Sequence, residues 1–208
     1  MMRRLLKAAA SFAPRSVLVR RGPADRPSIA LTFDDGPLDE IDAYLDALDR
    51  LAVRATFFLV GEECARRPSK VTEIVARGHE VAGHGFTHRP FPELSFGELR
   101  DELARTSALL PPSERARSLV RPPRGAVSPR SLSACALLGY TTVLFSLDSD
   151  DCRTRSVDEV VAKVGRARAG DIVLLHEGQG WTLEALPRVV ADARAAGLAL
   201  VTVGEMLA

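Results

Sequence analysis

Short apolar runs alternate with longer amphipathic stretches from Ser28 to the end of the chain. The apolar runs have the length and composition of buried strands, and they cover residues 29–33, 55–60, 80–82, 119–121, 141–147, 172–175 and 198–201. The stretches between them repeat apolar residues at helical spacing, which predicts helices over 42–51, 70–77, 96–110, 129–138, 157–166 and 183–196. This alternation indicates a parallel α/β sheet, either open or closed into a barrel.

Length and composition favour one well-buried domain. The chain has 208 residues, of which 46% are hydrophobic, and its formal net charge is +1. That balance predicts no nucleic-acid partner, and no apolar run is long enough to span a bilayer. The cysteines Cys64, Cys135 and Cys152 have a spacing that matches neither a zinc clip nor a disulfide framework, so we expect reduced thiols.

Residues 1–27 differ from the rest because basic side chains outnumber acidic ones. The basic start resembles a secretory signal, but Lys7 interrupts a short apolar region, so we favour a cytoplasmic protein, with export as the alternative. We expect residues 1–27 to form a basic arm or short helix that packs on, or is tethered to, a domain spanning 28–208. Weak contact of this arm with an anionic membrane surface is the alternative.

Two adjacent carboxylates, Asp34 and Asp35, stand where the first apolar run meets the break Gly36-Pro37. The run predicts a strand that ends here, because Gly-Pro does not continue a strand. Adjacent carboxylates repel each other, and burying them is costly unless a cation or strong donor neutralises at least one. A solvated turn also explains such a pair, so the hypothesis of a metal site depends on what the other strand ends carry.

Two histidines, His84 and His88, follow the third predicted strand. At this spacing the two rings can converge on one cation if the segment makes a single turn. Gly85 excludes a zincin motif, which has glutamate directly after the first histidine. A core or capping histidine is the alternative explanation for either residue.

Three further strand ends carry polar groups. Arg121 is followed by two prolines, which fix the backbone and leave the N–H of Arg124 free to face a ligand. An acidic cluster at 148–151 follows the fifth run, and His176 ends the sixth. Each has a simpler explanation when taken alone: a surface ion pair for Arg121, a solvated loop for the acidic cluster and a core histidine for His176. Together they place acids and bases where ligands of α/β sheets collect.

These residues are similar to those of a known family, the NodB-homology polysaccharide deacetylases of carbohydrate esterase family 4. The similarity extends from about Ser28 to the C-terminus and rests on five motifs in order, TFDDGP at 32–37, HGFTH at 84–88, RPPRG at 121–125, DSDDC at 148–152 and LLH at 174–176. The resemblance implies a single-domain distorted (β/α) barrel with about seven parallel strands. It also implies a metal-dependent hydrolase that removes N-acetyl groups from amino sugars.

The resemblance assigns roles to individual residues. Asp35, His84 and His88 would bind a divalent metal, for which we expect zinc, with cobalt, nickel or iron as alternatives. Asp34 would act as the general base towards the attacking water, and His176 would protonate the leaving amine.

Four further residues would support this chemistry in the same way. Arg121 would keep Asp34 ionised and oriented, and Asp151 or Asp148 would keep His176 protonated. The backbone N–H of Arg124 would stabilise the developing oxyanion.

The chain departs from the family pattern around the substrate. The family usually has Ser or Thr at Gly85, an aromatic residue at Arg124, and tryptophans near Phe145 and Cys152. The implied ligands, base and acid are intact, so these departures affect the substrate more than the chemistry. The absence of a tryptophan at Cys152 removes an apolar wall that would cradle the acetyl methyl group or a sugar face.

Two apolar residues remain as candidates for substrate contact. Leu174 is the pocket residue that the family pattern leads us to expect. Trp181, the only tryptophan, follows His176 closely and either stacks on a sugar or packs under the last helix. The scarcity of other aromatic residues suggests a short or unusual N-acetylated carbohydrate, of chitooligosaccharide or peptidoglycan type or a small N-acetylated sugar.

Three function classes stay open at this point. The leading hypothesis is the metal-dependent deacetylase. A carbohydrate-binding relative with weakened catalysis is the second, suggested by the altered aromatic positions. A non-haem iron oxygenase is the third, because two histidines and one carboxylate also form that site, although such an enzyme does not need Asp34, Arg121 and His176 around its metal.

Overall fold

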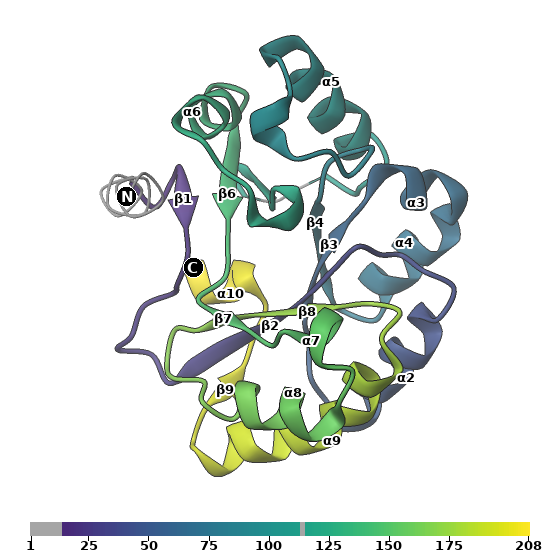
Figure 1. Ribbon diagram of the computed structural model, residues 1–208, viewed down its shortest axis with the longest axis vertical. Coiled ribbons are helices and arrows are strands. Elements are labelled where there is room, and N and C mark those ends of the chain that lie inside the picture. Colours follow the sequence, from purple (N-terminus) through teal and green to yellow (C-terminus); the bar gives the residue numbers. More distant parts are fainter. Residues whose placement is uncertain (1–13, 113–114) are drawn as a thin grey trace.

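A single sheet of parallel strands curls around the centre of the molecule, and helices cover its outer face (Figure 1). The computed structural model describes residues 14–112 and 115–208. The strand order is β1-β6-β5-β4-β3-β2-β8-β7, and β9 pairs separately with β2. Among the described strands β1 and β7 form the two edges, so the barrel is open, and the distorted (β/α) barrel that the family resemblance implied is confirmed. The bounds are β1 Leu18–Val19, β2 Ser28–Asp34, β3 Thr56–Leu59, β4 Glu80–Gly83, β5 Ser118–Val120, β6 Tyr140–Val143, β7 Leu147–Asp148, β8 Ile172–His176 and β9 Ala199–Leu200.

The predicted helices are present with small shifts at their ends. The α-helices are α2 Ile41–Leu51, α3 Gly61–Arg66, α4 Pro68–Ala76, α5 Phe96–Ser107, α6 Pro129–Leu137, α7 Asp151–Thr154, α8 Val157–Val164, α9 Gly180–Ala195 and α10 Val203–Leu207. Two short 3₁₀ helices, η2 and η3, cover Phe91–Glu93 and Pro123–Gly125. The pattern did not predict α3, α7 and α10, because elements of one or two turns are too short to display helical periodicity.

One predicted strand is wrong. The run 141–147 forms two strands, β6 and β7, which lie in different parts of the sheet. Strand β6 pairs with β5 and β1, whereas β7 pairs with β8. The change of partner occurs at Ser146, which lies between the two strands. Its N–H donates to the Ile172 carbonyl at the start of β8, and its hydroxyl donates to Asp171. Periodicity alone does not reveal a change of partner within an unbroken apolar run.

The central strand β2 is buried along its whole length. The alternation of its side chains between the two faces of the sheet determines where Asp34 points. Ile29, Leu31 and Phe33 point outward and pack in the main core with α2, α8 and α9. Because successive side chains of a strand point to opposite faces, Thr32 and Asp34 point to the interior of the barrel. A buried polar pair on this face requires partners from other strands.

Part of the predicted N-terminal arm belongs to the sheet. Leu18 and Val19 form β1, which pairs with β6, and Arg21 forms an ion pair with Asp171, with Nε 3.0 Å from Oδ1. Residues 1–13 lie outside the described residues. Within the described residues, no helix is long and apolar enough to cross a membrane. The three cysteines are unpaired, with Cys64 and Cys135 buried and Cys152 exposed.

Candidate active site

A pocket of 330 Å³ lies at the carboxyl ends of the strands, and most of the predicted site residues line it. Strand β2 ends at Asp34 and Asp35 directly follows it, whereas His176 is the last residue of β8. His84 directly follows β4, and Arg124 lies on the turn after β5. The parallel arrangement therefore brings together residues that are far apart in the sequence.

Asp35, His84 and His88 form one group whose ligand atoms all lie within 4.8 Å of one another. The Oδ1 atom of Asp35 is 3.5 Å from Nε2 of His84 and 3.1 Å from Nε2 of His88. Burial opposes the charge of Asp35, but hydrogen bonding to the two histidines outweighs it, and the pKa of Asp35 is held well below its ordinary value. Two imidazoles and one ionised carboxylate facing one point fit a divalent cation of the zinc type.

The backbone around the two histidines explains how they converge. The segment is a loop rather than a helix, with left-handed conformations at Gly85 (φ 79°) and His88 (φ 58°). Nδ1 of His84 is 2.8 Å from the Arg121 carbonyl oxygen. An N–H at that position donates to the carbonyl and leaves Nε2 free to bind a cation, which is the usual support for a ligating histidine.

Glu102 on α5 holds this loop, and sequence analysis did not identify it. Its buried carboxylate accepts hydrogen bonds from the N–H groups of Phe86 (2.6 Å) and Thr87 (2.8 Å) and from the Thr87 hydroxyl (2.6 Å). The available signal was an acidic residue on the apolar face that Leu99, Leu103 and Thr106 define. Its partners lie 15 and 16 residues away in the chain, so spacing within the helix gave no indication of them.

We expect Glu102→Gln to weaken metal binding by about 10- to 100-fold, the usual cost of losing the support of a ligand. The amide retains one acceptor oxygen and loses the second, so the loop that carries both histidines is held less firmly. Competition with a chromogenic chelator measures the metal dissociation constant, and thermal unfolding checks the fold. Asp101→Asn, which changes a neighbouring exposed acid that pairs with Arg100, is the matched control. An unchanged dissociation constant in Glu102→Gln would contradict the prediction.

The opening of α3 holds the loop from the other side. The N–H groups of Gly61 and Glu62 donate to the carbonyls of Gly85 (2.9 Å) and Phe86 (3.0 Å). A β-carbon on Gly61 would come within 2.4 Å of the Phe86 ring, so glycine is required for this approach. The loop is thus fixed by backbone contacts that an unpredicted helix supplies.

Asp34, which lines the pocket, forms a buried ion pair with Arg121. Nη1 of Arg121 donates to Oδ1 of Asp34 at 2.6 Å and to the Thr32 hydroxyl at 2.7 Å. Arg121 is 0% exposed, and its guanidinium lies over the Phe58 ring with Cζ 3.9 Å from the centroid. Oδ2 of Asp34 is 3.7 Å from Nε2 of His84. One oxygen of Asp34 is therefore held by Arg121, and the other stands beside the candidate cation site.

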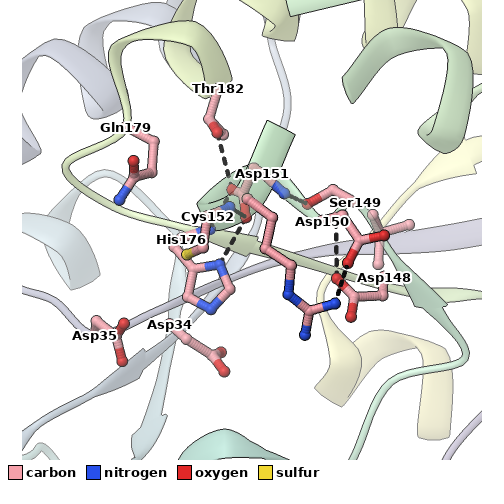
Figure 2. A network of polar contacts seen from close by, with 12 residues as sticks. Asp34, Asp35, Asp148, Ser149, Asp150, Asp151, Cys152, His176, Gln179 and Thr182 are labelled. Carbon is pink, nitrogen blue, oxygen red and sulfur yellow. Dashed lines mark hydrogen bonds and ion pairs between the residues drawn. The ribbon is translucent and has the colours of Figure 1, made fainter. Parts of the chain in front are cut away.

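His176 is held by Asp151, and Figure 2 shows its ring between Asp151 and the pair Asp34 and Asp35. Asp151 is 0% exposed; its Oδ1 is 2.7 Å from Nδ1 of His176, and its Oδ2 accepts from the His176 backbone N–H at 2.8 Å. Thr182 donates a further bond to Oδ2 at 2.8 Å. Burial lowers the pKa of His176, but hydrogen bonds to Asp151 and Cys152 outweigh it and raise the pKa well above its ordinary value.

The other candidates separate clearly. Of the two aspartates proposed as partners of His176, Asp151 contacts its ring, whereas the Asp148 carboxylate accepts the backbone N–H of Asp150 (2.8 Å). Leu174 and Asp148 line the pocket. Trp181 is not among the lining residues; its ring packs against the main core and its Nε1–H donates to the Asp151 carbonyl at 2.7 Å.

Glu177 supports the turn after Asp35 and also went unnoticed in the sequence. It is 2% exposed, and its Oε2 accepts from the Leu38 N–H at 3.1 Å. A β-carbon on Gly36 would come within 1.8 Å of its Oε1, so the carboxyl occupies the space that this glycine leaves. Burial, with the nearby charges of Asp35 and Glu40, raises the pKa of Glu177 to about 8.

The chain is thus an α/β protein, an open parallel barrel whose pocket contains two histidines and one carboxylate, flanked by a second acid and a third histidine. The family model for polysaccharide deacetylases matches residues 21–143. A peptidoglycan-N-acetylglucosamine deacetylase of Bacillus cereus is 32% identical over 192 residues, covering 89% of this chain and 90% of that protein. A chitooligosaccharide deacetylase of Sinorhizobium fredii is 37% identical over 168 residues, covering 77% and 76%. The chain belongs to the polysaccharide deacetylase family.

Solved structures agree with this assignment. The Bc1960 peptidoglycan N-acetylglucosamine deacetylase superposes with a TM-score of 0.86 at 27% identity, over 94% of this chain and 97% of that one. BA3943 of Bacillus anthracis, described as a pseudoenzyme of carbohydrate esterase family 4, superposes with a TM-score of 0.85 at 25% identity, over 95% and 71%. The same fold thus occurs in a protein named as a deacetylase and in one described as a pseudoenzyme, so the fold alone does not show whether a protein is catalytic.

Proposed function

We propose that this protein is a metal-dependent hydrolase that removes N-acetyl groups from carbohydrates containing N-acetylglucosamine. The observation that carries the proposal is the meeting of Asp35, His84 and His88 in the pocket that also contains Asp34 and His176. The names of the relatives support the substrate class, since they are described as deacetylases of peptidoglycan and chitooligosaccharides.

Asp35, His84 and His88 would hold the metal, and zinc fits the donor set best, with cobalt, nickel or iron as alternatives. When bound, such a cation polarises a carbonyl oxygen and lowers the pKa of water. The low pKa of Asp35 means that this ligand would already be ionised. The contact of His84 with the Arg121 carbonyl already orients its ring.

The remaining residues account for the proton transfers of amide hydrolysis. Asp34 accepts the proton of the attacking water with its free oxygen, while Arg121 keeps the other oxygen oriented. The backbone N–H of Arg124 would donate to the developing oxyanion. His176 donates a proton to the leaving amine, and Asp151 keeps that imidazole protonated. Arg121 favours the ionised form of Asp34, and Asp151 favours the protonated form of His176. The two residues would therefore have the opposite protonation states that a base and an acid require.

The proposal is tested by acetate release. Purified protein supplied with zinc or cobalt is incubated with chitooligosaccharides, peptidoglycan fragments and small N-acetylated sugars, and acetate is measured enzymatically. We expect release from at least one carbohydrate, together with metal bound by the purified protein. No acetate from any substrate with any of the metals would end the proposal.

A carbohydrate-binding protein with weakened catalysis is the second candidate, favoured by the structural similarity to BA3943. The intact group of Asp34, Asp35, His84, His88 and His176 argues against it. Saturable binding of the oligosaccharides without acetate release would identify this alternative.

A further inference from the structure

The pocket contains a second group of side chains that can hold a metal ion. Among the described residues, Asp151, Cys152 and His176 each offer one ligand atom, and these atoms lie within 4.8 Å of one another. The group shares no residue with the candidate cation site described above, although both groups line the same pocket. It also differs in chemistry, because one of its ligand atoms is a sulfur.

Cys152 is an accessible thiol beside an imidazole. It is the exposed one of the three cysteines, and it lines the pocket. Its hydrogen bond with His176 contributes to the raised pKa of that ring, so the sulfur lies within reach of a ring nitrogen. Figure 2 shows the sulfur beside the ring. A thiolate and an imidazole at this separation can bind the same ion, and both are ligands that zinc prefers.

The backbone that carries Asp151 and Cys152 is held at several points. The N–H of Cys152 donates to Oδ1 of Asp151 at 2.9 Å. The Asp151 carbonyl accepts from Nε1–H of Trp181 at 2.7 Å. The preceding residue, Asp150, forms an ion pair with Lys163 on α8. Ligands on a segment fixed in this way lose little conformational freedom when an ion binds, which favours affinity.

We infer that Cys152 and His176, with Asp151 as a third and weaker donor, form a second metal site that takes soft divalent cations, and that an ion bound there inhibits the protein. The inhibition rests on the proposed deacetylase function, whereas the binding does not. A thiolate favours zinc or cadmium over magnesium or calcium. Asp151 is the weaker donor because both its oxygens already accept hydrogen bonds.

An ion at this site would remove a proton that the proposed reaction needs. Binding forms a sulfur–metal and a nitrogen–metal bond and releases one proton from the thiol and one from the imidazolium. His176 is the residue proposed to protonate the leaving amine, and a ring that binds a cation has given up its imidazolium proton. Zinc should therefore support acetate release when it fills the first site and inhibit it when it also fills the second.

Ultraviolet absorption measures binding at the second site. Protein loaded with one equivalent of zinc is titrated with cadmium, because a cadmium–thiolate bond produces a charge-transfer band. The candidate ligands of the first ion include no sulfur, so the band reports the second site. We expect a band that saturates in the wild type and is absent in Cys152→Ser. Cys135→Ala, which removes a buried thiol, is the matched control and should keep the band. A wild type without the band would overturn the inference.

His176→Gln distinguishes a metal site from a single exposed thiol. A thiol that acts alone binds cadmium equally well in this variant, whereas a shared site loses one of its ligands. With a competing chelator, we expect the cadmium dissociation constant to rise by more than about tenfold, since even the indirect support of a ligand usually contributes that much. Thermal unfolding checks the fold. An unchanged dissociation constant would reduce the site to a lone thiol and contradict the inference.

Acetate release tests the inhibition. Each protein is assayed with one equivalent of zinc and with increasing excess, and its rates are normalised to its own rate at one equivalent. We expect excess zinc to inhibit the wild type, and half-inhibition of Cys152→Ser to need at least about tenfold more zinc. Equal inhibition of the two proteins would refute the inhibitory role. If no substrate releases acetate, the hydrolase proposal fails, while the cadmium band still decides whether the second site exists.

Discussion

Replacing Asp34 by asparagine is expected to lower kcat by about 10³-fold, within the range that a positioned general base contributes. The amide oxygen can still accept a hydrogen bond from Arg121, so the variant removes the charge and basicity with little change of shape. Asp34 is not among the three ligands that form the cation group, so the metal content should remain. Steady-state acetate release measures kcat, and metal analysis with thermal unfolding shows whether the site and fold are intact.

Asp46→Asn is the matched control for Asp34→Asn. Asp46 is an acid on the surface of α2. It pairs with Arg77, which is not one of the site residues. We expect its kcat to stay within about twofold of the wild type, because exposed ion pairs contribute little. Asp34→Asn protein that keeps more than a tenth of the wild-type kcat with bound metal would show that another group accepts the proton.

Replacing Asp151 by asparagine is expected to move the basic limb of the pH profile of kcat to lower pH and to lower kcat about 100-fold at pH 8. Asp151 raises the pKa of His176, so the protonated acid persists to high pH in the wild type. Without that charge, burial lowers the pKa of His176. The protonated fraction then falls at a lower pH, and the proton for the leaving amine is lost there. The profile of kcat against pH measures the shift directly.

Thr182→Val provides the control for this second prediction. It removes one hydrogen bond to Oδ2 of Asp151 and leaves the charge beside His176. We expect its basic limb to move much less than that of Asp151→Asn. If the limb stays in place when Asp151 becomes neutral, then either His176 is not the acid or another group sets its pKa.

The sequence predicted the architecture and most of the site for one physical reason. Alternating strands and helices produce a parallel sheet, and parallel strands present their carboxyl ends on one side. Asp34, Asp35, His84 and His176 all stand at or just after such ends, so the pattern alone predicts that they lie close together. The roles of individual residues came from the family resemblance.

The residues that the sequence did not reveal act through contacts that have no local signature. Glu102 holds backbone groups of a loop that lie 15 and 16 residues before it in the chain, and the Glu177 carboxyl occupies the space that Gly36 leaves. The division of 141–147 into β6 and β7 depends on which strands flank each half of the run. Such features are set by tertiary pairing, which hydrophobic periodicity does not report.

The burial of Arg121 also bears on how catalysis is lost in evolution. Any change at Asp34 that removes its acceptor leaves the buried guanidinium with bonds to Thr32 and backbone carbonyls but without a counter-ion, at a cost of about 3–5 kcal/mol, which is a large part of the stability of an ordinary domain. The side chains of Asp35 and His88 are 38% and 34% exposed and carry no comparable penalty. Lineages descending from such a protein should therefore lose activity first through changes at Asp35 or His88, and retain the Asp34–Arg121 pair because the stability of the fold depends on it.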